Sequence, residues 1–293
     1  MQLAFNSFID RINKIDFKEG RDLAYLLLSP QLLEIKETDE FIVHGSEEYL
    51  IDKILDIQPF LDGRSKNFHR LGKYLESLLY IFFHNSDDYH LITSSLQIQD
   101  GKNTKGEIDF ILEFIKDKTS IHLEVALKYY LQFDRASFIG PNGKDSLNEK
   151  INKLKNHQLK LCSNYRQLLP SKLIDLDLKP QLFIRGLLLF RLQVWEKRKN
   201  PNAHNEGWWC RYSEIDLIKD TMVCIVNDKM NWIYPFANLS FPLSPIEFKN
   251  QLEMKQKKDM SLMVVRTDKK GMLLDRGFVV SEHWPNQTKS LVS

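Results

Sequence analysis

The sequence predicts a mixed α/β fold, and three features of its hydrophobic pattern lead to that prediction. Strand-like patterns follow one another between residues 89 and 128. Helical patterns lie on either side of them, at 67–84 and from 146 onward. A continuous apolar run of strand length follows at 181–190, which is typical of a strand covered on both faces. We therefore expect a central mixed sheet flanked by helices.

Length and composition are those of a globular protein with one structural unit. The chain has 293 residues, of which 43% are hydrophobic and 27% charged. No internal repeat and no low-complexity linker interrupts it, so we expect a helical N-terminal extension (1–60) joined to one larger domain (61–293). The formal net charge is only +2. Any nucleic-acid-binding surface must therefore be local.

The sequence carries no sign of secretion or membrane insertion. Its three cysteines, Cys162, Cys210 and Cys224, form no CxxC pair and are odd in number, which favours free thiols in a reducing compartment. The N-terminus lacks a basic region followed by a sustained apolar run, so we expect no signal peptide. No uncharged apolar stretch approaches the roughly 18–20 residues of a membrane span. We expect a cytoplasmic protein.

The N-terminal region is predicted to be helical. Residues 21–28 form a short apolar helix that Pro30 ends. Arg21 and Asp22 lie at its start, and an internal ion pair is favoured over a functional role because partly buried charges are usually paired.

The helix predicted at 67–84 is apolar almost all round. Glu76 is therefore unlikely to be fully solvated. It is either a rim glutamate beside Lys73 or a functional carboxylate, and the sequence leaves both interpretations open.

Three strands follow this helix. The first, 89–99, has a polar face with Gln97 and Gln99, and a turn at 100–103 leads into the second. The residues 116–119 separate the second strand from the third, which makes an antiparallel hairpin plausible.

Charged side chains share a face on each of the last two strands. Alternation places Glu107 and Asp109 together on the second strand. It places Glu124, Ala126 and Lys128 together on the third. If the strands pair, Asp109, Glu124 and Lys128 converge on one spot. Such charges are costly in apolar surroundings unless they pair or bind a cation, so this stretch predicts a metal site.

A helix is predicted to begin at a capping box, Ser146 to Glu149, and to continue to Leu161. Gln158 falls on its buried stripe. A second, basic stripe contains Lys150, Lys153, His157 and Lys160. These lysines are either a solvated helix face or a track for phosphates.

The order helix, three strands, helix, strand resembles the PD-(D/E)XK nuclease-like superfamily. The resemblance implies a restriction-endonuclease-like α-β-β-β-α-β core in which Asp109 and Glu124 bind Mg²⁺ or Mn²⁺. It implies that Lys128 is the catalytic amine and that Glu76 is a further ligand or orients water. It also implies that Gln158 positions the site from the helix.

One position departs from the superfamily pattern. The lysine normally lies two residues after the glutamate, where this chain has Ala126. Lys128 is on the same face but about 6–7 Å further along the strand, at roughly 3.3 Å per residue.

Further motifs resemble an uncharacterised bacterial family, domain of unknown function 1853. They include Arg21-Asp22-Leu23-Ala24, Gly106-Glu107-Ile108-Asp109, Leu123 to Lys128, His157-Gln158-Leu159, Gly207-Trp208-Trp209, Arg276 to Val280 and Trp284-Pro285. This resemblance implies a bacterial cytoplasmic protein without an established activity, and it implies that the displaced lysine is a family trait.

The leading hypothesis is a Mg²⁺-dependent nuclease-like protein that acts on DNA, with Lys150, Lys153 and Lys160 holding the strand backbone. A catalytically inactive nucleic-acid-binding or interaction protein and a buried structural charge network are the alternatives. The sequence contains no HExxH, GxGxxG, P-loop or GxSxG motif, so zinc hydrolase, nucleotide-binding and serine hydrolase chemistry have no anchor.

Overall fold

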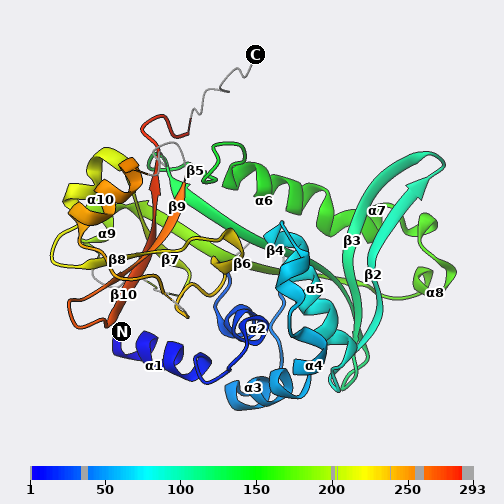
Figure 1. Cartoon of the computed structure of the whole chain (residues 1–293). Coiled ribbons are helices and arrows are strands. Elements are labelled where there is room, and N and C mark those ends of the chain that lie inside the picture. Colours follow the sequence, from blue (N-terminus) through cyan, green and yellow to red (C-terminus); the bar gives the residue numbers. More distant parts are fainter. Residues whose placement is uncertain are drawn as a thin grey trace. The chain divides into compact units, whose positions relative to one another are not determined.

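The computed structural model describes residues 2–33, 39–198, 202, 204–237, 239–254 and 261–285 (Figure 1). The chain divides into two compact units, each built from separate segments. Unit 1 comprises Met1–Lys14, Lys128–Asn148 and Gly186–Ser293, and unit 2 comprises Ile15–Leu127 and Glu149–Arg185. Strands β4 and β6 continue from one unit into the other.

Unit 2 contains the predicted series of helix, three strands, helix and strand. Its elements are α2 (Lys18–Leu28), β1 (Asp39–Glu40), α3 (Glu47–Asp56), α4 (Gln58–Leu61), α5 (Leu71–His84), β2 (Tyr89–Asp100), β3 (Asn103–Phe114), the first part of β4 (Thr119–Gln132), most of α6 (Leu147–Asn156), α7 (Leu161–Asn164), α8 (Ser171–Ile174) and the first part of β6 (Lys179–Arg191). Short 3₁₀ helices cover Arg64–Asn67, Gln158–Lys160 and Arg166–Leu168.

The sheet of unit 2 has the order β2-β3-β4-β6, with β1 parallel to β6. Strands β2 and β3 form a long antiparallel hairpin, from Tyr89 opposite Phe114 to Asp100 opposite Asn103. Strands β3 and β4 form the expected second hairpin, in which Phe114 faces Thr119. The predicted series of three strands and the predicted antiparallel hairpin of the second and third are confirmed.

Apolar residues bury both faces of this sheet. Ile98 and Ile108 of the long hairpin pack with Leu161 of α7 and Leu173 of α8 in one buried cluster. Phe83, at the end of α5, meets the ring of Phe110 edge-on, with 5.6 Å between ring centroids. Burial of these side chains holds α5 and α7 against β3, because removing apolar surface from water is the main favourable term in folding.

Unit 1 contains α1 (Gln2–Ile12), β5 (Phe138–Ile139), α9 (Leu192–Trp195), β7 (Glu206–Arg211), β8 (Met222–Ile225), α10 (Pro245–Met254), β9 (Leu262–Thr267), β10 (Leu273–Val280) and 3₁₀ helices at Tyr212–Leu217 and Lys229–Asn231. Its sheet has the order β6-β7-β10-β9-β8, with β5 beside β4. Strand β7 is parallel to β6 and β10, whereas β9 is antiparallel to β10 and β8. The sheet is therefore mixed, as the sequence predicts.

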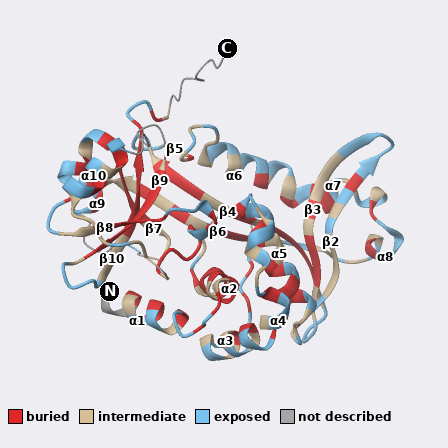
Figure 2. Ribbon diagram, viewed as in Figure 1, coloured by how far each residue is buried: buried red, intermediate tan, exposed pale blue. Residues whose placement is uncertain are grey.

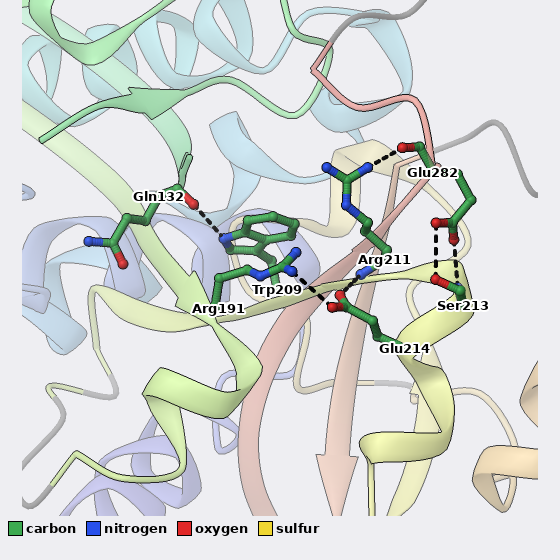
Figure 3. Close-up of polar contacts among 7 residues, drawn as sticks. All are labelled: Gln132, Arg191, Trp209, Arg211, Ser213, Glu214 and Glu282. Carbon is green, nitrogen blue, oxygen red and sulfur yellow. Dashed lines mark hydrogen bonds and ion pairs between the residues drawn. The ribbon is translucent and has the colours of Figure 1, made fainter. Parts of the chain in front are cut away.

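A polar network ties β7 of unit 1 to the segment that follows β10 (Figure 3). Glu214 accepts from the Arg191 guanidinium at 2.9 Å and from the Arg211 backbone N–H at 2.8 Å. Glu282 accepts from Ser213, and its own carbonyl accepts from Arg211. The indole N–H of Trp209 donates to the Gln132 carbonyl at 3.0 Å, and the Arg191 guanidinium lies over the Trp209 ring. These hydrogen bonds link β6, β7, the 3₁₀ helix after β7 and the segment after β10, which suits a structural role.

The helix predicted at 67–84 begins only at Leu71, and two further predictions for the helical regions differ from the structure. The predicted helix at 146–161 ends as α6 at Asn156, because His157 leaves the helical conformation (φ −133°, ψ −68°). Gln158 therefore lies on the following 3₁₀ turn. The expected ion pair of Arg21 with Asp22 is also wrong, since Arg21 donates to the Ile15 carbonyl while Asp22 pairs with Lys18. Within the described part of the chain, no helix has the length and hydropathy needed to cross a bilayer.

Candidate metal centre

The site in unit 2 begins where β3 and β4 stop pairing. Their ladder runs from Phe114 opposite Thr119 to Phe110 opposite Leu123. Beyond this pair, the backbone N–H of Val125 on β4 donates to the Asp109 carboxylate on β3 at 2.9 Å. A side chain thus takes a bond that a main-chain carbonyl would accept in a continued ladder, and the carboxylate is held between the two strands.

Three carboxylates meet at this point. One oxygen each from Glu76, Glu107 and Asp109 lies within 4.8 Å of the others. Glu76 comes from α5, whereas Glu107 and Asp109 come from the same face of β3. All three side chains are half-buried. The sequence predicted Glu76 and Asp109 for the site but did not include Glu107.

A lysine already neutralises part of this negative charge. The Lys73 ammonium lies 2.6 Å from Glu76 and 3.2 Å from Glu107. Lys73 precedes Glu76 by three residues on α5, the spacing at which helical side chains are neighbours. Of the three carboxylates, Lys73 therefore forms ion pairs with Glu76 and Glu107 and not with Asp109.

The surroundings of Asp109 raise its pKa to about 7. Burial is the largest cause, because it disfavours the charged form, and the negative charges of Glu124 and Glu76 act in the same direction. The Val125 N–H and the positive charge of Lys150 oppose this rise. A cation bound at Asp109 would relieve the same repulsion.

Glu124 is fully buried, and both of its oxygens have partners. One oxygen lies 3.0 Å from Nε2 of His122, and the other accepts from the side-chain amide of Gln158 at 2.8 Å. These contacts fix the orientation of the carboxylate. A carboxylate has about four lone-pair positions, so each oxygen keeps capacity for a further ligand.

Gln158 connects Glu124 to an amine. Its amide oxygen accepts from the Lys150 ammonium at 3.0 Å. Lys150 of α6, Gln158 of the next 3₁₀ turn, Glu124 and His122 therefore form one chain of contacts, and the charge of Lys150 also reaches Asp109. The sequence predicted Lys150 as a nucleic-acid contact, and the structure brings it to the carboxylates.

The other predicted lysines are Lys153, Lys160 and Lys128. Lys153 of α6 and Lys160 of the 3₁₀ turn are exposed. Lys128 belongs to unit 1, where its ammonium donates to Asp145 at 2.8 Å. Ala126, at the usual position of the superfamily lysine, is buried. The catalytic role of Lys128 stays a prediction.

Three features of the site escaped the sequence prediction: the contact of Lys73 with Glu107, Glu107 itself and His122. The predicted neighbourhood of Glu76 and Lys73 is confirmed. His122 lies two residues before Glu124 on one strand, so alternation places both side chains on the same face. Glu107 shares a face with Asp109 for the same reason. This signal could have identified both residues, whereas the contacts of Lys73 depend on how α5 packs against β3.

A search of curated proteins and a search of solved structures found no match to the chain. A family model described as "domain of unknown function (DUF1853)" matches residues 21–280. The match extends from within α2 to the end of β10 and includes every residue of the candidate centre. The chain therefore belongs to the family domain of unknown function 1853.

Proposed function

We propose that this protein is a metal-dependent phosphodiesterase that acts on nucleic acid, with DNA as the expected substrate. The observation that carries the proposal is the meeting of Glu76, Glu107 and Asp109, whose oxygens lie within 4.8 Å of one another. The chain order α5-β2-β3-β4-α6-β6 supports assignment of unit 2 to a restriction-endonuclease-like core. This assignment rests on element order and on the resemblance of the motifs.

The donor atoms of the cluster suit Mg²⁺ or Mn²⁺. All are carboxylate oxygens, which hard divalent cations prefer, and the cluster has no thiolate that would favour a soft metal. Burial and the neighbouring negative charges raise the pKa of Asp109, and a bound cation would stabilise its ionised form in this setting. We infer that Asp109, Glu76 and Glu107 hold the ion, with Glu124 beside them. When bound, such an ion lowers the pKa of a coordinated water and stabilises charge on a phosphate.

The remaining residues orient these groups. His122 and Gln158 hold Glu124 in one position, and Gln158 is in turn held by Lys150. We infer that Lys150 supplies positive charge for the phosphate at the reacting end of the site, because its charge reaches Asp109. Exposed Lys153 and Lys160 follow Lys150 along the chain and would hold the substrate backbone.

Divalent-metal binding is the first test. Isothermal titration calorimetry with Mg²⁺ and Mn²⁺ should give binding to the wild type and at least about ten-fold weaker binding to Asp109→Ala, since even outer partners of metal ligands change affinity 10–100-fold. Asp52→Ala, an exposed position on α3, is the matched control. A wild type that binds neither ion would remove the metal-dependent mechanism.

Cleavage is the second test. Plasmid and single-stranded DNA should be cut by the wild type and not by Glu124→Ala. Lys150→Ala and Lys128→Ala, compared side by side, decide which amine matters. Cutting at wild-type rates by all three variants would mean that another site or a contaminant is responsible.

A second function is favoured by the charge pairing in the structure. Lys73 already contacts two carboxylates, and Lys128 is paired with Asp145. A catalytically inactive nucleic-acid-binding protein would keep these ion pairs as structural contacts. It would bind oligonucleotides with equal affinity in the presence of Mg²⁺ and of a chelator, and it would release no product.

A further inference from the structure

We propose that Tyr80 forms a stacking subsite for an unpaired nucleobase beside the candidate metal centre. This inference rests on the proposed function, and it adds that the substrate is single-stranded or has an unpaired base next to the reacting phosphate. Three observations on α5 carry it: the side on which the ring lies, its exposure, and the geometry of the neighbouring ring.

Helix α5 has one narrow solvent-facing stripe (Figure 2). Eight of its residues are buried, among them Leu75, Leu78 and Phe82. The stripe contains Lys73, Glu76, Tyr80 and His84, spaced by three or four residues, so these side chains lie on one face. Glu76 is a carboxylate of the metal cluster, and Tyr80 is the next side chain along the stripe after it.

The Tyr80 ring is exposed although the helix around it is apolar. Its exposed fraction is 42%, which is high for a large aromatic side chain on a helix with this much buried surface. The rings of Tyr80 and His84 are close to parallel, with an interplanar angle of 8° and 5.6 Å between centroids. His84 therefore lies beside Tyr80 along the stripe, and both side chains are exposed.

The position of the ring matches the size of the group it would bind. A separation of four residues corresponds to about 6 Å along a helix, so the ring lies about one turn from the Glu76 carboxylate. A phosphodiester at the metal cluster would therefore place its own base within reach of the ring. Stacking of a base on an aromatic side chain is tolerant of sequence because every base has a π-face.

The geometry also selects the kind of nucleic acid. Bases in a duplex are stacked on their neighbours and offer only their edges, so a side chain cannot stack on one unless it is unpaired or flipped out. An exposed ring beside the reacting phosphate consequently favours single strands, frayed ends or flaps over continuous duplex. On β2, exposed Gln97 lies opposite Glu107 and so borders the same cluster.

The test is a binding measurement in a chelating buffer, where no cleavage interferes. The probe is a single-stranded oligonucleotide that contains 2-aminopurine, whose fluorescence falls when the base stacks. Wild type and Tyr80→Phe should quench it, whereas Tyr80→Leu should bind about ten-fold more weakly, the factor that corresponds to one stacked base. Phe60→Leu, which removes another exposed aromatic ring of unit 2, should leave binding unchanged.

Two results would overturn the subsite: no quenching by the wild type, or equal affinity of wild type and Tyr80→Leu for the single strand. The subsite would also be overturned if Tyr80→Leu weakened binding to a fully paired duplex as much as it weakened binding to the single strand. Cleavage in Mg²⁺ or Mn²⁺ separates the two proposals. Tyr80-dependent quenching without cleavage keeps the subsite and removes the phosphodiesterase, whereas cleavage that is indifferent to Tyr80→Leu does the reverse.

Discussion

Asp109 is the residue at which burial, charge and hydrogen bonding meet. Its pKa is raised to about 7, whereas an unfolded aspartate titrates near 3.9. Between these values the folded chain binds more protons than the unfolded chain, so this group makes the free energy of unfolding fall as pH rises. The Asp109 carboxylate therefore destabilises the metal-free fold at neutral and alkaline pH.

Replacing Asp109 with Asn should remove that contribution to the pH dependence of stability. In a chelating buffer, Asp109→Asn should gain stability relative to wild type as pH rises from about 4 to about 8, because only the wild type must bury the ionised carboxylate. Urea unfolding midpoints across that range would measure the difference. A constant difference at all pH values would contradict the raised pKa. Addition of Mg²⁺ at pH 8 should stabilise the wild type more than the variant, since a ligand that binds only the folded state stabilises it.

His122 gives a second prediction at the scale of single residues. Its Nε2 atom contacts buried Glu124, and its Nδ1 atom is buried without a hydrogen-bond partner. His122→Ala should destabilise the protein by about 3 kcal/mol, because it removes a partner from a buried carboxylate. His122→Gln can still donate to Glu124, so it should lose less stability and recover part of any nuclease activity. Equal losses in both variants would assign His122 to packing alone.

At the scale of elements, one partly buried carboxylate of unit 1 joins β9, β10, β7 and α9. Asp275 of β10 accepts from Nε and from one terminal nitrogen of Arg266 at 2.8 and 2.7 Å. It also accepts from the indole N–H groups of Trp208 and Trp195 at 2.8 and 3.0 Å. Arg266 is buried, so its charge depends on this partner and on Glu196.

Asp275→Asn should therefore be strongly destabilising. It leaves the buried Arg266 guanidinium without its main counter-charge, a change that typically costs about 3–5 kcal/mol. Trp195→Phe is the graded control, because it removes one of the four hydrogen bonds and should cost roughly 1 kcal/mol. Guanidinium unfolding followed by tryptophan fluorescence would rank the variants. An Asp275→Asn protein as stable as Trp195→Phe would contradict the importance of the ion pair.

At the scale of the whole molecule, the formal charge of +2 limits how nucleic acid can bind. Overall attraction is weak, so affinity has to come from a few local phosphate contacts, and the salt dependence counts them. The slope of log K against log salt concentration changes by about 0.9 for each phosphate contact on duplex DNA and by about 0.7 on single strands.

The double variant Lys153→Ala/Lys160→Ala should reduce that slope by about 1.4 to 1.8 while leaving metal binding unchanged. Fluorescence anisotropy with a labelled oligonucleotide at several salt concentrations measures it. Lys116→Ala, which removes an exposed lysine from the turn between β3 and β4, should leave the slope unaltered. A slope that does not respond to the double variant would mean that these lysines form an ordinary solvated surface.

The sequence by itself determined the strands, their hairpins and the helices on either side. These features follow from periodicity, which is local: alternation decides that Glu107 and Asp109 share a face, and helical spacing decides that Glu76 and Tyr80 do. It also indicated that charges within apolar strands need partners, which pointed to Asp109 and Glu124 before any contact was known. The capping box at Ser146 predicted where α6 begins but not where it ends.

Only the tertiary structure decided which partner each charge has. The position of α5 against β3 brings Glu76 and Lys73 to Glu107, and the 3₁₀ turn after α6 brings Gln158 and Lys150 to Glu124. The path of the chain after β4 gives Lys128 to Asp145. Such pairings join residues far apart in the sequence. They are set by the packing of whole elements, whereas periodicity fixes only the direction in which each side chain leaves its own element.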